Sequence, residues 1–293
     1  MANKFKQPQR MENNTPITAP SQLPHNDKNE FDFGKAVLLF LESNLVVIPF
    51  LIILLIIGFA TGAISNTGKE GMMATITEST AVMLFSILIQ NGYAIWKGKK
   101  RTNINSFNFT GFSFLIAILL ILTVFTSGYL SSELITFLQL PDISKISKMS
   151  LLSKVLGGII LAPILEEILF RGIILEAFLK KYDISKAILF SALLFGTVHF
   201  NPPQILSASI FGLILGWIYY RTKSLLPCIF MHFVNNLLAF VPSIFPKLKE
   251  SVLFQDGTLY SNIANPIIYV LVILGLLSML YVSIRLLDKQ LKR

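Results

Sequence analysis

Leu161-Ala-Pro-Ile-Leu-Glu166-Glu167-Ile-Leu-Phe-Arg171-Gly172 is the stretch that decides the fold of this 293-residue chain. It is apolar enough to form a membrane-spanning helix, yet it contains two adjacent glutamates and an arginine. Ionisable groups in the middle of a bilayer cost roughly 2.5 to 3.5 kcal/mol each on insertion scales. Three of them together therefore indicate a functional site or a buried ion pair.

The composition of the whole chain supports placing this stretch in a membrane. Hydrophobic residues make up 53% and charged residues 14%, and the mean hydropathy is +0.66, which lies outside the range of ordinary soluble proteins. The 25 lysines and arginines exceed the 16 acidic residues, but they lie in short clusters between apolar runs, so a nucleic-acid partner is not expected. A single cysteine, Cys228, excludes an intrachain disulfide and a cysteine-cluster metal site.

The hydrophobic pattern predicts an all-α polytopic membrane protein with about eight transmembrane helices, since a crossing needs about 20 apolar residues. Residues 1–34 are polar and contain four prolines, so we expect a disordered cytoplasmic tail, followed by a transmembrane domain over residues 35–293. The predicted spans are residues 45–65, 76–96, 111–131, 151–179, 184–200, 203–221, 225–245 and 264–287.

Clusters of lysine and arginine predict the orientation, because short cytoplasmic loops are enriched in these residues. With an even number of spans, both termini are expected on the cytoplasmic side, with the plasma membrane as the location. The clusters assigned to that side are Lys97, Lys99, Lys100 and Arg101, then Lys180 and Lys181, then Arg221 and Lys223, and finally Arg285, Lys289, Lys292 and Arg293. Small residues at Ala208, Gly212 and Gly216 predict close approach of two helices.

Two of the three histidines fall within predicted spans and share those spans with other polar or aromatic residues. Phe195 and His199 are four residues apart, as are His232 and Asn236, so each pair shares a helix face. Glu167 and Arg171 have the same spacing, in the favourable order for an ion pair. Glu166 points about 100° away from Glu167 around an α-helix and is left without a local partner.

These residue types allow two kinds of chemistry. A glutamate with a histidine could hold and deprotonate a water molecule, while a second histidine and an amide could stabilise the oxyanion of a peptide carbonyl under attack. Alternatively, Glu166, His199 and His232 could ligate a Zn²⁺ ion that carries a water molecule. The residues alone are equally compatible with the metal-dependent and the metal-independent scheme.

In this order, Glu166-Glu167-xxx-Arg171, Phe195-xxx-His199 and His232-xxx-Asn236 resemble the three motifs of the CAAX prenyl protease and bacteriocin-processing family of intramembrane endopeptidases. The resemblance covers roughly residues 150–240. It implies a helical bundle around an intramembrane cavity, with Glu166 as catalytic base, His199 helping to bind the water, and His232 and Asn236 stabilising the oxyanion. Glu167, Arg171 and Phe195 would then support these groups.

The resemblance also implies a substrate class: prenylated or other membrane-associated peptides, with links in bacteria to peptide processing and bacteriocin immunity. Two alternatives remain open, a proton- or ion-coupled transporter that uses the same buried groups, and a non-catalytic immunity or scaffold protein.

The expected depths of the motif residues in the membrane do not favour a meeting of the three motifs in space. In straight helices that start from the predicted cytoplasmic ends, Glu166 would lie roughly 20 Å deep, His199 roughly 25 Å and His232 about 12 Å, at 1.5 Å per residue. Tilted helices, a broken helix near Pro163 or near Pro227, or misplaced span boundaries would be needed to bring the three residues together.

Overall fold

Helices account for every regular element in the computed structural model, which describes residues 30–60, 80–143, 150–245, 263 and 265–291. Four of these helices are long and apolar enough to cross a membrane. They are α1 (Phe33–Ala60), α4 (Phe114–Phe137), α8 (Pro202–Thr222) and α11 (Pro266–Gln290). The predicted fold class is confirmed: this is an all-helical integral membrane protein.

Each predicted span overlaps a helix in the described part of the chain, although the boundaries move; residues 61–65, 76–79 and 264 of the predicted spans lie outside that part. The remaining single helices are α3 (Thr80–Thr102), α7 (Ile184–Thr197) and α9 (Leu225–Ile244). Helix α1 begins twelve residues before the predicted start at residue 45. Residues 1–29 lie outside the described part of the chain, so the disordered tail stays a prediction.

The fourth span is one helical stretch that contains two π-helical segments. It consists of η1 (Ser153–Leu161), α5 (Ala162–Glu167), η2 (Ile168–Leu175) and α6 (Glu176–Lys181), in which η1 and η2 are π-helical. π-Helical turns are rare and frequently occur at functional sites. The helix is therefore not broken near Pro163, but π-helical turns lie on both sides of the Glu166-Glu167 pair.

No helix break occurs at Pro227. Helix α9 continues through Pro227 without interruption. A proline in the first turn of a helix is tolerated, because the amides of that turn have no intrahelical acceptor.

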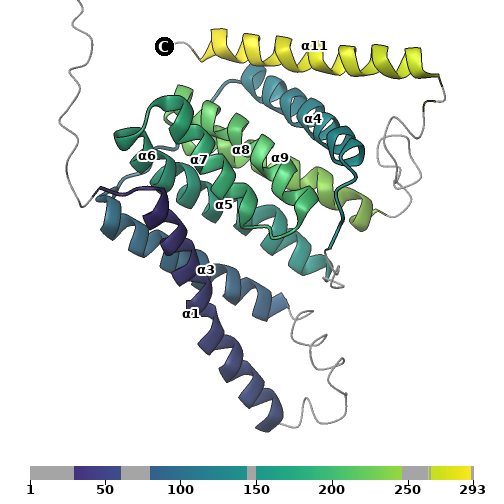
Figure 1. Cartoon of the computed structure of the whole chain (residues 1–293). Coiled ribbons are helices and arrows are strands. Elements are labelled where there is room, and N and C mark those ends of the chain that lie inside the picture. The colour runs from purple at the N-terminus through teal and green to yellow at the C-terminus, as the bar shows by residue number, and fades with distance from the viewer. Residues whose placement is uncertain (1–29, 61–79, 144–149, 246–262, 264, 292–293) are drawn as a thin grey trace, which may run out of the picture. The chain divides into compact units, whose positions relative to one another are not determined.

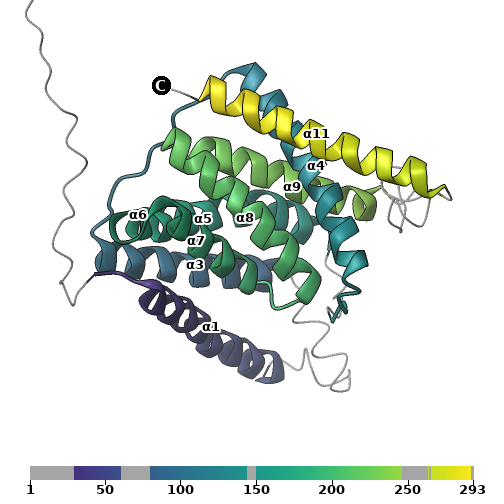
Figure 2. The same ribbon diagram turned by 45° about the horizontal axis from the view of Figure 1, so that its top comes forward.

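The helices form three groups (Figures 1 and 2). Helices α1 and α3 pack together on one side and α4 packs with α11 on the other, while the stretch from η1 to α9 lies between them. Many apolar side chains of α11 are exposed, among them Ile267 at 70% and Leu271 at 62%. Such a surface is the one expected to face lipid.

The helix pair α7 and α8 packs closely at glycines, as the small-residue pattern predicts. A Cβ atom on Gly212 would lie 3.1 Å from Cα of Ala192, and one on Gly216 would lie 3.0 Å from Cγ2 of Ile188. Any side chain at these positions would push α8 away from α7. The pair forms one wall of the site described below.

The basic clusters predicted to share one membrane side do meet at one end of the bundle. Lys97 and Arg101 at the end of α3 contact Glu42 of α1 at 3.0 and 2.8 Å. Further ion pairs join the ends of α6, α8 and α11: Lys181 with Asp32, Lys223 with Glu176, and Arg221 with Asp288. These contacts group the helix ends without identifying the compartment they face.

Candidate active site

The predicted ion pair between Glu167 and Arg171 is present in the core of the bundle. Arg171 Nη1 donates to Glu167 Oε1 at 3.1 Å, and both side chains are fully buried. Arg171 Nη2 donates to the backbone carbonyl of Gly212 at 3.2 Å, and the guanidinium lies 4.5 Å from the ring centroid of Phe195. One arginine therefore connects α5 and η2 to α7 and α8.

His232 of α9 completes this buried cluster. Its Nδ1 lies 2.8 Å from Glu167 Oε1, the same oxygen that Arg171 contacts. Because a carboxylate only accepts hydrogen bonds, Nδ1 carries the proton and the orientation of the imidazole is fixed. The rings of Phe195 and Phe211 meet the imidazole edge-on at 5.5 and 5.9 Å.

Glu166 faces the other side of this imidazole. Its Oε2 lies 3.9 Å from His232 Nε2, which is too far for a direct hydrogen bond. This buried oxygen has no hydrogen-bond partner among the described residues, although the side chain as a whole is 22% exposed. The carboxylate also interacts electrostatically with His199. Glu166 is thus an acidic group with an unused oxygen next to an oriented imidazole.

His199 lies just beyond α7, in the turn that follows Thr197, and not within the helix as predicted. Its Nδ1 donates to the backbone carbonyl of Phe195 at 3.0 Å, which leaves Nε2 for another partner. The Phe195 ring is in edge contact with His199 as well as His232, at 5.5 Å in each case. Phe195, which is 1% exposed, therefore packs against both imidazoles and the guanidinium.

Asn236 lies one helical turn after His232 on α9, and its side chain bonds to backbone. Nδ2 donates to the carbonyl of Gly158 in η1 at 2.8 Å, while Oδ1 accepts from Asn235 at 3.3 Å. Sequence reasoning placed Asn236 near the reacting carbonyl, and this bond to Gly158 was not foreseen.

The three residues considered as zinc ligands do not form a complete ligand set. Nowhere in the described part of the chain do three or more His, Cys, Asp and Glu side chains converge closely enough to hold a metal ion. Nδ1 of His232 is bonded to Glu167, and His232 Nε2 and Glu166 Oε2 remain as donors near each other. The side chains as placed thus do not fit a three-ligand zinc site.

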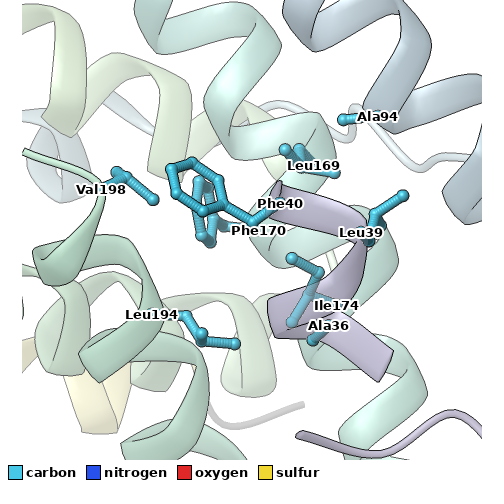
Figure 3. A pocket seen from close by; sticks show the side chains of 9 residues that line it. All are labelled: Ala36, Leu39, Phe40, Ala94, Leu169, Phe170, Ile174, Leu194 and Val198. Atoms are coloured by element: carbon cyan, nitrogen blue, oxygen red, sulfur yellow. The ribbon is translucent and has the colours of Figure 1, made fainter. Parts of the chain in front are cut away.

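Figure 3 shows a small apolar pocket, with a volume of about 10 Å³, whose wall includes residues from the same helices as the site. It lies between α1, α3, η2 and α7, and Leu169 and Val198 in its wall are close neighbours in sequence of Glu167 and His199. The residues that line it are Ala36, Leu39, Phe40, Ala94, Leu169, Phe170, Ile174, Leu194 and Val198. Apolar surface thus lies close to the polar groups of the site.

The structure therefore brings Glu166, Glu167, Arg171 and His232 into direct proximity, which the depth estimates for straight helices opposed. Sequence reasoning missed the bond from His232 to Glu167 because it treated Glu167 as satisfied by Arg171 alone. No sequence signal identifies Gly158 or Gly212 as acceptors, since backbone carbonyls are present in every residue.

Comparison with known proteins gives an independent result for the same region. Residues 148–238 match the family model for type II CAAX prenyl endopeptidases, Rce1-like. These residues include all three motifs, so the family resemblance found in the sequence is confirmed.

A protein of Bacillus subtilis (strain 168) named "Putative membrane peptidase YdiL" is 36% identical over 87 residues. The match covers 30% of this chain and 36% of that relative, so the chain is matched over about a third of the length of this curated relative. No solved structure matches the chain.

Proposed function

We propose that this chain, whose residues 148–238 belong to the Rce1-like family of CAAX prenyl endopeptidases, is an intramembrane endopeptidase that hydrolyses membrane-associated peptides. The observation that carries the proposal is the relationship between Glu166 and His232. A buried carboxylate oxygen without a hydrogen-bond partner lies 3.9 Å from an imidazole nitrogen whose ring is fixed by a second carboxylate.

This geometry suits general-base catalysis by Glu166. A water molecule held by Glu166 and His199 gives a proton to the Glu166 carboxylate as its oxygen bonds to the peptide carbonyl carbon. The carbonyl electron pair moves to the carbonyl oxygen, and the C–N bond of the intermediate then breaks. The proton returns from Glu166 to the leaving nitrogen, so that the carboxylate is regenerated.

The oxyanion requires donors that are already in place. The two oxygens of the intermediate are bonded to one carbon, so Glu166 and Nε2 of His232 can each face one of them. With a proton on Nε2, His232 donates to the oxyanion. Because Glu166 then carries the proton taken from water, the charges of His232 and Arg171 face those of Glu167 and the oxyanion. Donors fixed in a water-poor interior are worth far more than donors in water. The motif also suggests Asn236 as an oxyanion donor, but its Nδ2 donates to the backbone carbonyl of Gly158, so His232 is the donor assigned here.

The surroundings of the site suit an amphipathic substrate. The pocket of Figure 3 is lined by apolar side chains, and several helices expose apolar surface. We therefore propose a membrane-associated peptide, with or without a prenyl group, as the substrate. We also propose that the protein lies in the plasma membrane. The helix ends joined by the basic clusters would then face the cytoplasm.

The direct test is hydrolysis by the purified protein in lipid vesicles. A panel of membrane-anchored and prenylated peptides is incubated with wild type, Glu166→Ala and the control Glu176→Ala. Glu176 lies on the same helical stretch and pairs with Lys223 at its end. We expect cleavage by wild type and by the control, and loss of cleavage with Glu166→Ala.

Retained cleavage in the Glu166→Ala protein would refute the proposal. Each reaction is also run with a chelator, because chelator-sensitive cleavage would favour the metal-dependent scheme. Gradient-driven uptake without cleavage would favour the transporter. Peptide binding that survives the Glu166, His199 and His232 substitutions, without cleavage, would favour an immunity or scaffold protein.

A further inference from the structure

We propose that Asn236 is a positioning residue: its amide satisfies a backbone carbonyl that Pro163 leaves without a donor, and it thereby fixes Glu166 relative to His232. This inference rests on the proposed function, because the position of Glu166 matters for the hydrolysis suggested above. It assigns a role to a bond, from Asn236 to Gly158, that oxyanion chemistry does not require.

The first step concerns the register of η1. The amide of Ala162 donates to the carbonyl of Gly157, five residues earlier, as π-helical geometry requires. In the same register the next amide, at residue 163, would donate to Gly158. Residue 163 is a proline and has no N–H. The Gly158 carbonyl, which is partly buried, therefore loses the donor that the helix would supply, and an unpaired carbonyl away from water is costly.

The second step is the replacement of that donor from another helix. Asn236 Nδ2 reaches the Gly158 carbonyl at 2.8 Å. The approach depends on the absence of a side chain at residue 158, since a Cβ atom there would lie 2.7 Å from Cε2 of Phe240. Phe240 lies one turn after Asn236, on the same face of α9. Pro163 thus leaves the Gly158 carbonyl without a helical donor, and the lack of a side chain at Gly158 lets Asn236 reach that carbonyl.

The third step connects this bond to the site. Helix α9 is attached to the motif helix twice: Asn236 bonds to Gly158 before Pro163, and His232 bonds to Glu167 after it. Glu166 lies between these two attachments. Because its Oε2 has no hydrogen bond of its own, the distance from this oxygen to His232 is set by the helices that hold the two residues.

The test is a double-mutant cycle between Asn236→Ala and Pro163→Ala. An alanine at position 163 restores an amide, which in the π-helical register of this stretch donates to the Gly158 carbonyl. With the peptide that wild type cleaves fastest, we expect Asn236→Ala to lower kcat by about tenfold or more, with KM within about twofold. In the Pro163→Ala background, the same change should lower kcat by less than about threefold.

An oxyanion donor would behave differently, because its contribution does not depend on the residue at 163. Equal losses of kcat in both backgrounds would overturn the proposal. If Pro163→Ala does not give folded protein, a second cycle with Gly158→Ala decides. Displacing α9 at Gly158 should then lower kcat, and Asn236→Ala should add little further loss, whereas independent losses that multiply would contradict the proposal.

Thermal unfolding needs no substrate, so it tests this inference separately from the proposed function. Asn236→Ala should lower the unfolding temperature less in the Pro163→Ala background than in the wild-type background, whether or not any peptide is cleaved. Absence of cleavage by wild type would refute the endopeptidase, while the coupling of unfolding temperatures would still test the bond between the helices.

Discussion

Oε1 of Glu167 lies 2.8 Å from Nδ1 of His232 and 3.1 Å from Nη1 of Arg171, so a single carboxylate oxygen connects two of the three sequence motifs. Arg171 in turn rests against Phe195 of the remaining motif. Glu167 is thus the structural centre of the site, while its neighbour Glu166 is free to react.

Replacing Glu167 with glutamine should destabilise the protein by roughly 3 kcal/mol or more, the effect expected on breaking a buried ion pair. The substitution leaves the guanidinium of Arg171, which is fully buried, without its counter-charge. The measurement is the unfolding transition of the purified protein in detergent.

Glu176→Gln is the matched control for that substitution. Its pair with Lys223 is partly exposed, at 25% and 49% for the two side chains, and such pairs contribute about 0 to 1 kcal/mol. Equal losses of stability from Glu167→Gln and Glu176→Gln would contradict the central role of Glu167.

Stability should also depend on pH through Asp183, which lies between two predicted spans. The amide of Lys186 donates to its Oδ1 at 3.0 Å, and this bond, with the side chain of Lys186, lowers the pKa of Asp183 below its usual value of 3.8. A lowered pKa stabilises the fold above the unfolded-state pKa, and the contribution is lost as the pH falls through the folded-state value.

Asp183→Asn removes that charge but keeps an acceptor at the start of α7. We expect wild type to unfold at a higher temperature than Asp183→Asn at pH 7, with a difference that shrinks below about pH 4. A difference that stays constant down to about pH 2.5 would show that the charge of Asp183 does not contribute.

The sequence predicted the helical segments because lipid requires long apolar runs, and such runs are visible without tertiary information; four of the described helices are long and apolar enough to cross a membrane. It also predicted the pairing of Glu167 with Arg171, since both lie on one helix at a spacing of four. Local periodicity is sufficient for both predictions.

Contacts between helices could not be predicted in the same way. Straight-helix depths separated Glu166 from His232, whereas the structure places their side chains 3.9 Å apart. The difference arises from the π-helical turns around α5 and from the packing of α9, neither of which has a sequence period. Pro163 marked the irregular position, but the partner of the carbonyl it leaves free lies 73 residues further along, at Asn236.

The close approach of α7 and α8 predicts a large effect of Gly196→Ala. A Cβ atom at this position would clash with Ser209 Oγ and lie 2.6 Å from the backbone carbonyl of Ile205. Because backbone cannot rotate away, we expect a loss of about 1 to 3 kcal/mol, the usual cost of overpacking, measured by unfolding in detergent.

Gly128→Ala in α4 provides the comparison, since nothing lies within 4 Å of a Cβ atom there. That change should leave stability unchanged or raise it by up to about 1 kcal/mol through helix propensity. If the two alanine variants unfolded alike, the packing of α7 on α8 would not be limited by Gly196.

Glu166→Gln should separate catalysis from stability at the site itself. Oε2 of Glu166 is buried and has no hydrogen-bond partner among the described residues, so the Glu166 charge stabilises the folded protein little. A neutral amide of the same shape removes a charge from the interior, so the unfolding temperature should equal or exceed that of wild type.

The same change should lower kcat by roughly 10²- to 10⁴-fold, the usual contribution of a general base. Both quantities are measured on one preparation, with Glu167→Gln as the contrasting variant that loses stability. A Glu166→Gln protein that unfolds several degrees below wild type would instead assign Glu166 to the structural cluster of Glu167 and Arg171.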